Sequence, residues 1–276
     1  MTSIAVSFSE ISDFQTCTRL WWYKYVLRLR PRSVSSAIKR GHFGHDMLRQ
    51  FYESLQKHGN IAQAEQEMYS VLPEYKTEEM LTAYTLIRKY IEKDFDPRYT
   101  AIFSEKRFFV PIDDEVVIAI RPDLVLSYKD RLTSEDYKFI GRNWSSKKTI
   151  HAKQLDVYNI YLQEAGRKVS YSQFRFFNTS TFDIKVIPRH PDPERMKTVK
   201  REIEAVARKI AALRLKHDND PVAIEQEVSR TFNVNTCQYC AFDFPCLLTM
   251  EGKSAERTLA QDYVKDTEYA YIIANN

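Results

Sequence analysis

Apolar residues recur at intervals of three and four through the N-terminal third of the chain, which is the spacing of amphipathic helices. Ser7 and Glu10 stand three residues apart, a capping-box pattern that predicts a short helix running through Cys17. Further helices are expected at about residues 44–56 and 77–95, the second ending at Asp96-Pro97. The N-terminal third is therefore predicted to be helical.

The middle of the chain contains short apolar segments, separated by turn signals such as Lys129-Asp130, that are typical of β-strands. A long amphipathic helix follows, because apolar residues keep a strict three-four spacing from Met196 to Leu213. The expected strands are 101–112, 115–128 with a break at Pro122, 131–140, 168–178 and 181–187, the first three forming an antiparallel meander, and the expected helices are 147–166 and 192–217.

This order of elements predicts an α/β (mixed) fold, with a central mixed β-sheet flanked by helices. We expect a single domain over residues 1–250, followed by a polar, peripheral tail at 251–276. Within the domain, residues 1–100 form an N-terminal helical part, 101–190 the sheet with its helix, and 191–250 the C-terminal helices.

Composition narrows the function classes. Hydrophobic residues make up 43% of the chain and charged residues 28%, a globular balance. With 6 glycines and no glycine-rich phosphate motif, a nucleotide-binding loop is not expected. The net charge of +4 permits a polyanionic partner without requiring one. No signal peptide or long apolar run is present, so we expect a cytoplasmic protein with reduced thiols.

Three charged residues suggest a metal site. On a strand, Asp136 and Lys138 point to the same face, and Asp123 lies on the strand before. Carboxylates brought together repel each other unless a cation lies among them, and hard oxygen ligands suit Mg²⁺ or Mn²⁺. A neighbouring lysine could orient or activate a water, or stabilise charge on a phosphate. The simpler interpretation is an ordinary ion pair on an exposed strand.

Pro122-Asp123 followed by Asp136-x-Lys138 resembles the signature of the PD-(D/E)XK nuclease superfamily. Three further matches resemble its RecB-like branch: Gly41-x-x-x-His45, Gln154-x-x-x-Tyr158, and Glu105 before the strand that leads to Asp123. The sequence departs from the usual pattern at Ile120, where many relatives have glycine.

The resemblance implies a restriction-endonuclease-like core and assigns roles to these residues. His45, Asp123, Asp136 and the backbone carbonyl of Tyr137 would hold Mg²⁺ or Mn²⁺, with Glu105 in support. Lys138 would position or deprotonate the attacking water, and Gln154 and Tyr158 would position the DNA strand.

Four cysteines form a second pattern, in which Cys237-x-x-Cys240-x₅-Cys246 is compact and Cys17 lies far upstream. In a reducing compartment four thiolates suit structural Zn²⁺ or an iron–sulfur cluster, and the spacing alone does not choose between them. The pattern resembles the [4Fe–4S] site of AddB, the Cas-four CRISPR-adaptation nucleases and exonuclease V. That resemblance implies a cluster joining the N- and C-terminal parts of the domain.

A basic, aromatic stretch over residues 19–40 carries seven Lys or Arg and no acid. Such a stretch fits single-stranded DNA, whose bases stack on rings while cations follow the backbone. Alternatively, its rings pack around the cysteine cluster. Residues that could contact DNA are Arg19, Lys24, Arg142, Lys147 and Lys148.

The sequence thus predicts a divalent-metal-dependent DNA exonuclease that acts on single strands or free ends and carries a [4Fe–4S] cluster. The alternative is a non-catalytic or partner-dependent DNA-binding subunit of a recombination or CRISPR-adaptation complex. By analogy, a phage or CRISPR-associated enzyme and a homo-oligomer are both compatible with the sequence, and a viral protein would act in the host cytoplasm.

Overall fold

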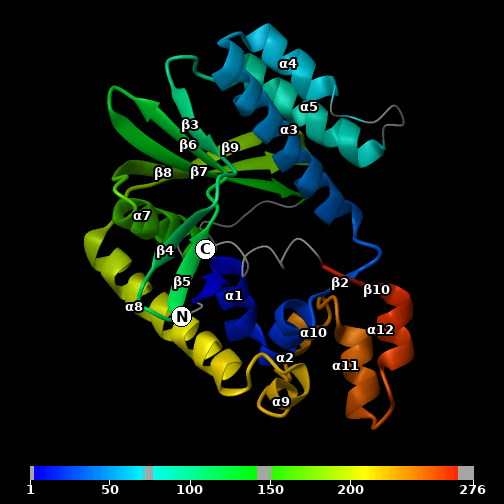
Figure 1. Cartoon of the computed structure of the whole chain (residues 1–276). Helices are drawn as coiled ribbons and strands as arrows, with labels where there is room; N and C mark the ends of the chain where they lie inside the picture. Colours follow the sequence, from blue (N-terminus) through cyan, green and yellow to red (C-terminus); the bar gives the residue numbers. More distant parts are fainter. Residues whose placement is uncertain (1–2, 71, 73–76, 142–148, 150, 267–276) are drawn as a thin grey trace. The chain divides into compact units, whose positions relative to one another are not determined.

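The computed structural model describes residues 3–70, 72, 77–141, 149 and 151–266 (Figure 1). The chain divides into two compact units, each built from segments far apart in the sequence. The first, here called the terminal unit, comprises residues 1–34, 109–119 and 201–276. The second, here called the sheet unit, comprises residues 35–108 and 120–200.

The sheet unit contains a mixed five-stranded sheet in the order β3-β6-β7-β8-β9. Strands β7 and β8 run parallel, and every other neighbouring pair is antiparallel. The predicted central mixed sheet is therefore confirmed. Its strands are β3 (Thr100–Ser104), β6 (Leu124–Tyr128), β7 (Arg131–Ile140), β8 (Val169–Asn178) and β9 (Ile184–Arg189).

Helices cover both faces of this sheet (Figure 1). Three of them build the core on one face, where Phe51 and Leu86 pack with Tyr137 and Phe177 of the sheet. The single helix on the other face has its middle residues buried almost all round. The three helices are α3 (Ser36–His58), α4 (Ile61–Ser70) and α5 (Glu78–Lys93), and the single helix is α7 (Gln154–Glu164).

Alternation along β7 separates its two faces. Tyr137 belongs to the core beneath α3, and Phe139 packs against that core. Lys138 instead donates to Gln154 of α7, on the opposite face. The prediction that Asp136 and Lys138 share a face follows from the same alternation and agrees with their 2.5 Å ion pair.

The terminal unit joins the two ends of the chain. A small sheet has the order β1-β5-β4, with β1 parallel to β5, and β10 pairs antiparallel with β2. Its strands are β1 (Ile4–Ser7), β2 (Leu29–Pro31), β4 (Phe108–Pro111), β5 (Val116–Ile120) and β10 (Tyr263–Lys265). Its helices are α1 (Phe8–Thr16), α2 (Thr18–Trp21), the π-helical turn η1 (Trp22–Val26), α9 (Pro221–Glu225), α10 (Val234–Cys237), α11 (Asp243–Met250) and α12 (Glu256–Asp262). A further helix, α8 (Pro193–Lys216), contributes residues to both units.

The aromatic rings near the N-terminus pack inside the terminal unit. Trp21, Trp22 and Tyr25 are all buried, as is Tyr23, which stacks on Phe242. The indole of Trp21 donates to the buried carboxylate of Glu10 at 2.9 Å. These rings are therefore packed and not available to stack on DNA bases, while their packing around a cysteine cluster stays a prediction.

Three local features differ from the sequence prediction. The expected helix through Cys17 is interrupted there, because Cys17 takes an extended conformation between α1 and α2. The expected strand 101–112 is two strands, β3 and β4, separated at Glu105, whose φ of 51° is left-handed. The expected peripheral tail contributes β10, whose Tyr263 donates to the Ala241 carbonyl at 2.6 Å.

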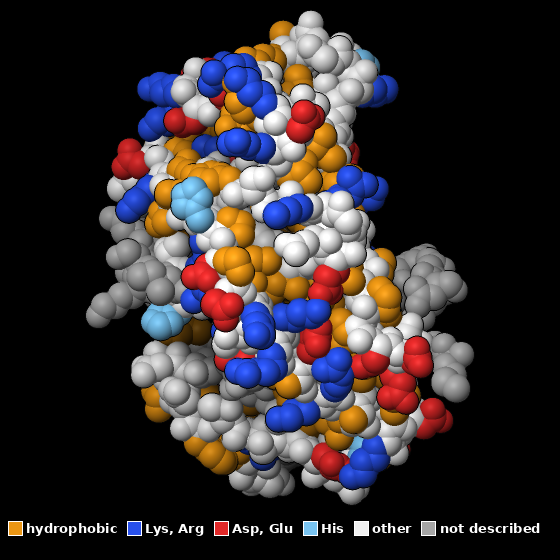
Figure 2. All heavy atoms as spheres, turned by 90° about the vertical axis from the view of Figure 1, so that its left-hand side faces the viewer, with side chains coloured by type: hydrophobic (Ala, Val, Ile, Leu, Met, Phe, Trp, Pro, Cys, Tyr) orange, Lys and Arg blue, Asp and Glu red, His pale blue; other side chains and the backbone are white. Residues whose placement is uncertain are grey.

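The surface in Figure 2 shows Lys and Arg side chains with Asp and Glu among them. On α8, for example, Arg208 pairs with Asp113 at 2.8 Å and with Glu204 at 3.4 Å. Arg208 is thus paired with neighbouring acids, as is common for basic residues on a solvated helix face. Within the described ranges, no helix is both long and apolar enough to cross a membrane.

Candidate metal centre

Three side chains from separate elements of the sheet unit converge at one place. His45 lies on α3, Glu105 directly follows β3, and Asp123 directly precedes β6. His45 Nδ1 lies 2.8 Å from Glu105 Oε1 and 3.7 Å from Asp123 Oδ2. One ligand atom from each residue lies within 4.8 Å of the other two, close enough to share a metal ion.

Glu105 has a larger part in this group than the sequence suggested. Its left-handed backbone ends β3, and its N–H donates to the Asp123 carbonyl at 3.1 Å. Its second carboxylate oxygen lies 3.0 Å from Arg121 Nε. Non-glycine residues in this conformation are strained and cluster at functional sites, so this conformation supports a functional role for Glu105.

Asp136 approaches the same place from β7. The antiparallel register pairs Leu124 with Glu135, so Asp123 and Asp136 are the next residues to meet across β6 and β7. The Tyr137 N–H donates to Asp123 Oδ2 at 2.6 Å. The prediction that two adjacent strands bring both carboxylates together agrees with this register.

Asp136 is fully buried. Although its Oδ2 lies 2.5 Å from the Lys138 ammonium, neither carboxylate oxygen has a well-aligned hydrogen-bond donor among the described residues. A buried carboxylate with this little hydrogen bonding is costly. Its two oxygens therefore fit a cation as a further partner.

A chain of polar contacts runs from Lys138 to α7. The Lys138 ammonium donates to Gln154 Oε1 at 2.9 Å, and the Gln154 amide donates to the Tyr158 hydroxyl at 2.7 Å. Residues four apart share a helix face, so Gln154 and Tyr158 act together. Of the two predicted helix residues, Gln154 thus contacts the predicted lysine directly, and the buried Tyr158 contacts it through Gln154.

The close carboxylates shift the protonation of the whole group. Burial alone would lower the pKa of His45, but Asp123 and Glu105 outweigh it and raise that pKa to about 9. Burial, together with the charge of Asp136, raises the pKa of Asp123 to about 7. Burial would also lower the pKa of Lys138, and the charges of Asp136 and Asp123 raise it instead. Excess negative charge is thus concentrated where a metal ion would neutralise it.

The donor set fits a hard divalent cation. Two or three carboxylates and one imidazole suit Mg²⁺ or Mn²⁺, and no thiol is part of this group. His45, Glu105 and Asp123 would hold the ion, and Asp136 lies next to this group without being part of it.

Metal affinity is expected to rise with pH up to about 9, and more steeply below about 7, where Asp123 as well as His45 is protonated in the metal-free protein. A bound ion must replace protons on these groups, and fewer protons need to be displaced as the pH rises. For each proton that metal binding displaces, the affinity for the metal rises by up to about tenfold per unit of pH. Calorimetric Mn²⁺ titrations across this range, in two buffers of different ionisation enthalpy, measure both affinity and proton release. An affinity that is independent of pH, without proton release, would contradict the assignment.

Gly44 allows α3 to approach the sheet beside His45. A Cβ added at Gly44 would lie 2.1 Å from the Phe139 ring, whereas one added at Gly41 meets nothing within 4 Å. Gly44→Ala is therefore expected to destabilise the protein by about 1–3 kcal/mol through overpacking. Gly41→Ala, the matched control on the same helix, should stabilise it by up to about 1 kcal/mol. Urea unfolding of both variants tests this, and equal midpoints would refute it.

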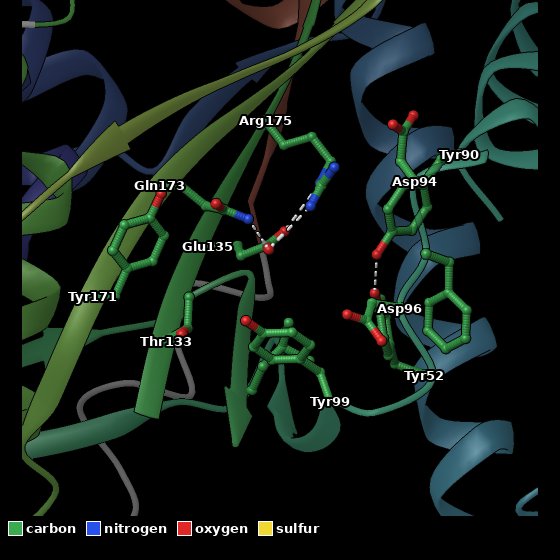
Figure 3. A pocket seen from close by; sticks show the side chains of 12 residues that line it. Tyr52, Tyr90, Asp94, Asp96, Tyr99, Thr133, Glu135, Tyr171, Gln173 and Arg175 are labelled. Atoms are coloured by element: carbon green, nitrogen blue, oxygen red, sulfur yellow. Dashed lines mark hydrogen bonds and ion pairs between the residues drawn. The ribbon is translucent and has the colours of Figure 1, made fainter. Parts of the chain in front are cut away.

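The face of β7 opposite to Asp136 and Lys138 borders a small polar cavity of about 130 Å³ (Figure 3). There the Glu135 carboxylate pairs with Arg175 at 3.1 Å and accepts from Gln173, and the hydroxyls of Tyr52 and Tyr90 bond to each other. Glu135, although adjacent to Asp136 in sequence, is thus part of a buried ion pair and not of the metal group.

The residues predicted to contact DNA lie in different environments. Arg19 is buried, 2.5 Å from Glu225 and over the Trp22 ring, which does not favour contact with DNA, and its role stays a prediction. Lys24 is about half exposed and pairs with Asp13 at 2.7 Å, and its role stays a prediction. Arg142, Lys147 and Lys148 lie outside the described residues.

The four cysteines all lie in the terminal unit, each partly buried. Three of them contact one short segment: Cys17 Sγ contacts the Ser229 carbonyl at 3.9 Å, Cys237 Sγ the Thr231 carbonyl at 3.2 Å, and Cys246 Sγ the Arg230 guanidinium at 3.3 Å. Burial raises the pKa of Cys240, and the other three thiols add to that effect. Among the described residues no three sulfurs lie within 4.8 Å of one another. The predicted iron–sulfur cluster is therefore not confirmed.

Comparison with known proteins identifies the family. The model of the PD-(D/E)XK nuclease superfamily matches residues 5–246, so the chain belongs to this superfamily. The search of curated proteins finds no match.

Two solved proteins are similar to this chain at low identity. The crystal structure of SSO0001 is 18% identical, with a TM-score of 0.35 over 74% of this chain and 84% of that chain. An alkaline exonuclease, LHK-Exo from Laribacter hongkongensis, is 11% identical, with a TM-score of 0.33 over 66% of this chain and 97% of that chain. The same enzyme in complex with dAMP gives a TM-score of 0.27 at 11% identity, over 64% of this chain and 98% of that chain.

Proposed function

We propose that this chain is a divalent-metal-dependent DNA exonuclease that hydrolyses phosphodiester bonds of single strands or free DNA ends. The observation that carries the proposal is the fully buried carboxylate of Asp136, which meets Lys138 on one face of β7 beside the His45–Glu105–Asp123 group. Membership of a nuclease superfamily gives this arrangement its chemical context.

The proposed function assigns a separate role to each group of site residues. His45, Glu105, Asp123 and Asp136 would hold the ion, with the Tyr137 carbonyl as a further ligand. The bound ion supplies Lewis-acid chemistry, lowering the pKa of a water and neutralising phosphate charge. Lys138, which lies 2.5 Å from Asp136 and donates to Gln154, would position or deprotonate the attacking water and stabilise charge on the phosphate. Gln154, backed by Tyr158, fixes the direction of that ammonium.

Cleavage of end-labelled DNA tests this function. Single- and double-stranded substrates are incubated with Mg²⁺ or Mn²⁺, with excess EDTA as the control. Shortening from an end that stops on chelation is the expected result, and the label's position gives the polarity. A folded protein that binds metal and DNA but cuts neither substrate would favour the alternative, a partner-dependent subunit of a recombination or CRISPR-adaptation complex.

We further propose that Cys17, Cys237, Cys240 and Cys246 hold a [4Fe–4S] cluster. Support comes from the segment 229–231, which contacts three of these thiols: the carbonyls of Ser229 and Thr231 lie against Cys17 and Cys237, and the Arg230 guanidinium donates to Cys246 Sγ. The Phe242 N–H also points at Cys240 Sγ, 3.4 Å away. Tetrahedral zinc would space its sulfurs about 3.8 Å apart. A four-iron cluster is larger than a single zinc ion, so its cysteine sulfurs lie further apart than they would around zinc.

Protein purified without oxygen is expected to be brown, with absorbance near ~400 nm from cysteine-ligated iron. Cys246→Ala should lower the stability of the fold and should not act on one chemical step. The reason is that a cluster closing the loop between Cys17 and Cys237 contributes roughly 4–5 kcal/mol. Iron and sulfide analysis with thermal unfolding measures both effects. Colourless protein with stoichiometric zinc would exclude the cluster.

A further inference from the structure

A buried carboxylate anchors the first turn of α7. Asp156 is 2% exposed, and its Oδ2 lies 2.9 Å from Arg195 Nε and 3.1 Å from Arg189 Nη2. Arg189 also donates to the carbonyls of Thr149 at 2.7 Å and Ala152 at 3.0 Å, and Arg195 reaches the Ala152 carbonyl at 3.4 Å. The two arginines, from β9 and α8, therefore hold both the helix and the chain that enters it.

The start of α7 combines apolar packing with this buried charge, since Leu155 and Val157 are also fully buried. The residue that precedes it, Lys153, makes no side-chain capping bond. A carboxylate in the first turn interacts favourably with the helix dipole, and Asp156 is the acidic residue there. Because its charge is buried, its pairing with the two arginines decides where this turn can lie.

The same turn carries Gln154. Successive helix residues are about 100° apart, so Gln154 and Asp156 project from different sides of α7. Asp156 faces Arg189 and Arg195, while Gln154 accepts from Lys138 at 2.9 Å. The ion pairs of Asp156 therefore fix the rotation and position of the first turn of α7, and these in turn determine the contact between Gln154 and Lys138.

We propose that Asp156, with Arg189 and Arg195, is a positioning device for Lys138 that acts through Gln154. This inference rests on the proposed nuclease function. Without the carboxylate the two arginines lose their shared partner, the first turn of α7 loosens, and Gln154 no longer fixes the lysine. Asp156 itself touches neither the metal group nor Lys138 in any contact described above.

Amide hydrogen exchange tests the device without reference to activity. Asp156→Asn and the milder Arg195→Gln should speed exchange in the first half of α7 by about tenfold or more, while β7 and β8 stay protected. Glu164→Gln, which removes the Lys200 pair in the last turn of the same helix, is the matched control and should leave the first half unchanged. Unchanged exchange in both network variants would overturn the proposal, and Arg195→Gln decides the matter if Asp156→Asn does not fold.

A double-mutant cycle tests the route. Asp156→Asn should lower kcat by about 10- to 100-fold with little change in KM. In a Gln154→Ala background the same substitution should have almost no further effect, because the contact that it disturbs is already gone. Fully additive losses would mean that Asp156 acts on general stability and would contradict this route. If the wild type cuts no DNA, the exchange experiment still decides the positioning, so the two failures are distinguishable.

Discussion

Replacing Lys138 with alanine is expected to lower the rate of DNA cleavage by about 100- to 1,000-fold at saturating Mn²⁺. The ammonium lies 2.5 Å from Asp136 and is oriented by Gln154, so it is placed to stabilise charge that develops on the phosphate. Because Lys138 is not a metal ligand, Mn²⁺ binding should persist. Single-turnover cleavage and calorimetric metal titration measure the two quantities separately.

Lys185→Ala is the control for this prediction, since Lys185 is an exposed residue of β9. It should cleave at the wild-type rate. A Lys138→Ala protein that folds, binds Mn²⁺ and still cleaves within about tenfold of the wild type would remove the lysine from the mechanism.

Asp123→Asn is expected to weaken Mn²⁺ binding by about 100-fold or more and to abolish cleavage at ordinary metal concentrations. Asp123 lies at the centre of the group, 3.7 Å from His45 and opposite Asp136 in the sheet register. Asparagine is nearly isosteric and can still accept the Tyr137 N–H, so the fold should be kept. What is lost is a negative charge at the ion, the main attraction for a hard cation.

Asp130→Asn is the matched control. Asp130 lies in the exposed turn between β6 and β7 with a φ of 61°, a conformation that asparagine tolerates well. Its affinity for Mn²⁺ should equal that of the wild type. If Asp123→Asn bound Mn²⁺ as tightly as this control, the metal would have to lie elsewhere.

The sequence predicted strongly patterned elements well. β7 has the predicted bounds, 131–140, and α8 begins and ends within one residue of its predicted bounds, 192–217. The predicted break at Pro122 separates β5 from β6, which belong to different sheets. The reversal at Glu105 was not predicted, since no glycine or proline marks it. Helix α4 was also missed.

The sequence located the site residues that fall in a short, ordered motif. Asp123, Asp136 and Lys138 are close in sequence, and two hydrogen-bonded strands necessarily bring them together. Contacts between residues far apart in the sequence were not predicted. The motif contains Gly41, whereas Gly44 is the glycine that packing against Phe139 requires. Asp156 reads as an ordinary helix residue, because its arginines lie more than thirty residues away in the sequence.

Mn²⁺ anomalous diffraction tests the central claim most directly. Crystals of the wild type soaked in Mn²⁺ are predicted to show an anomalous peak among the side chains of His45, Glu105, Asp123 and Asp136, and Asp123→Asn crystals should lack it. Crystals that take up Mn²⁺ at other positions while this group stays without a peak would contradict the assignment of this group as the metal centre.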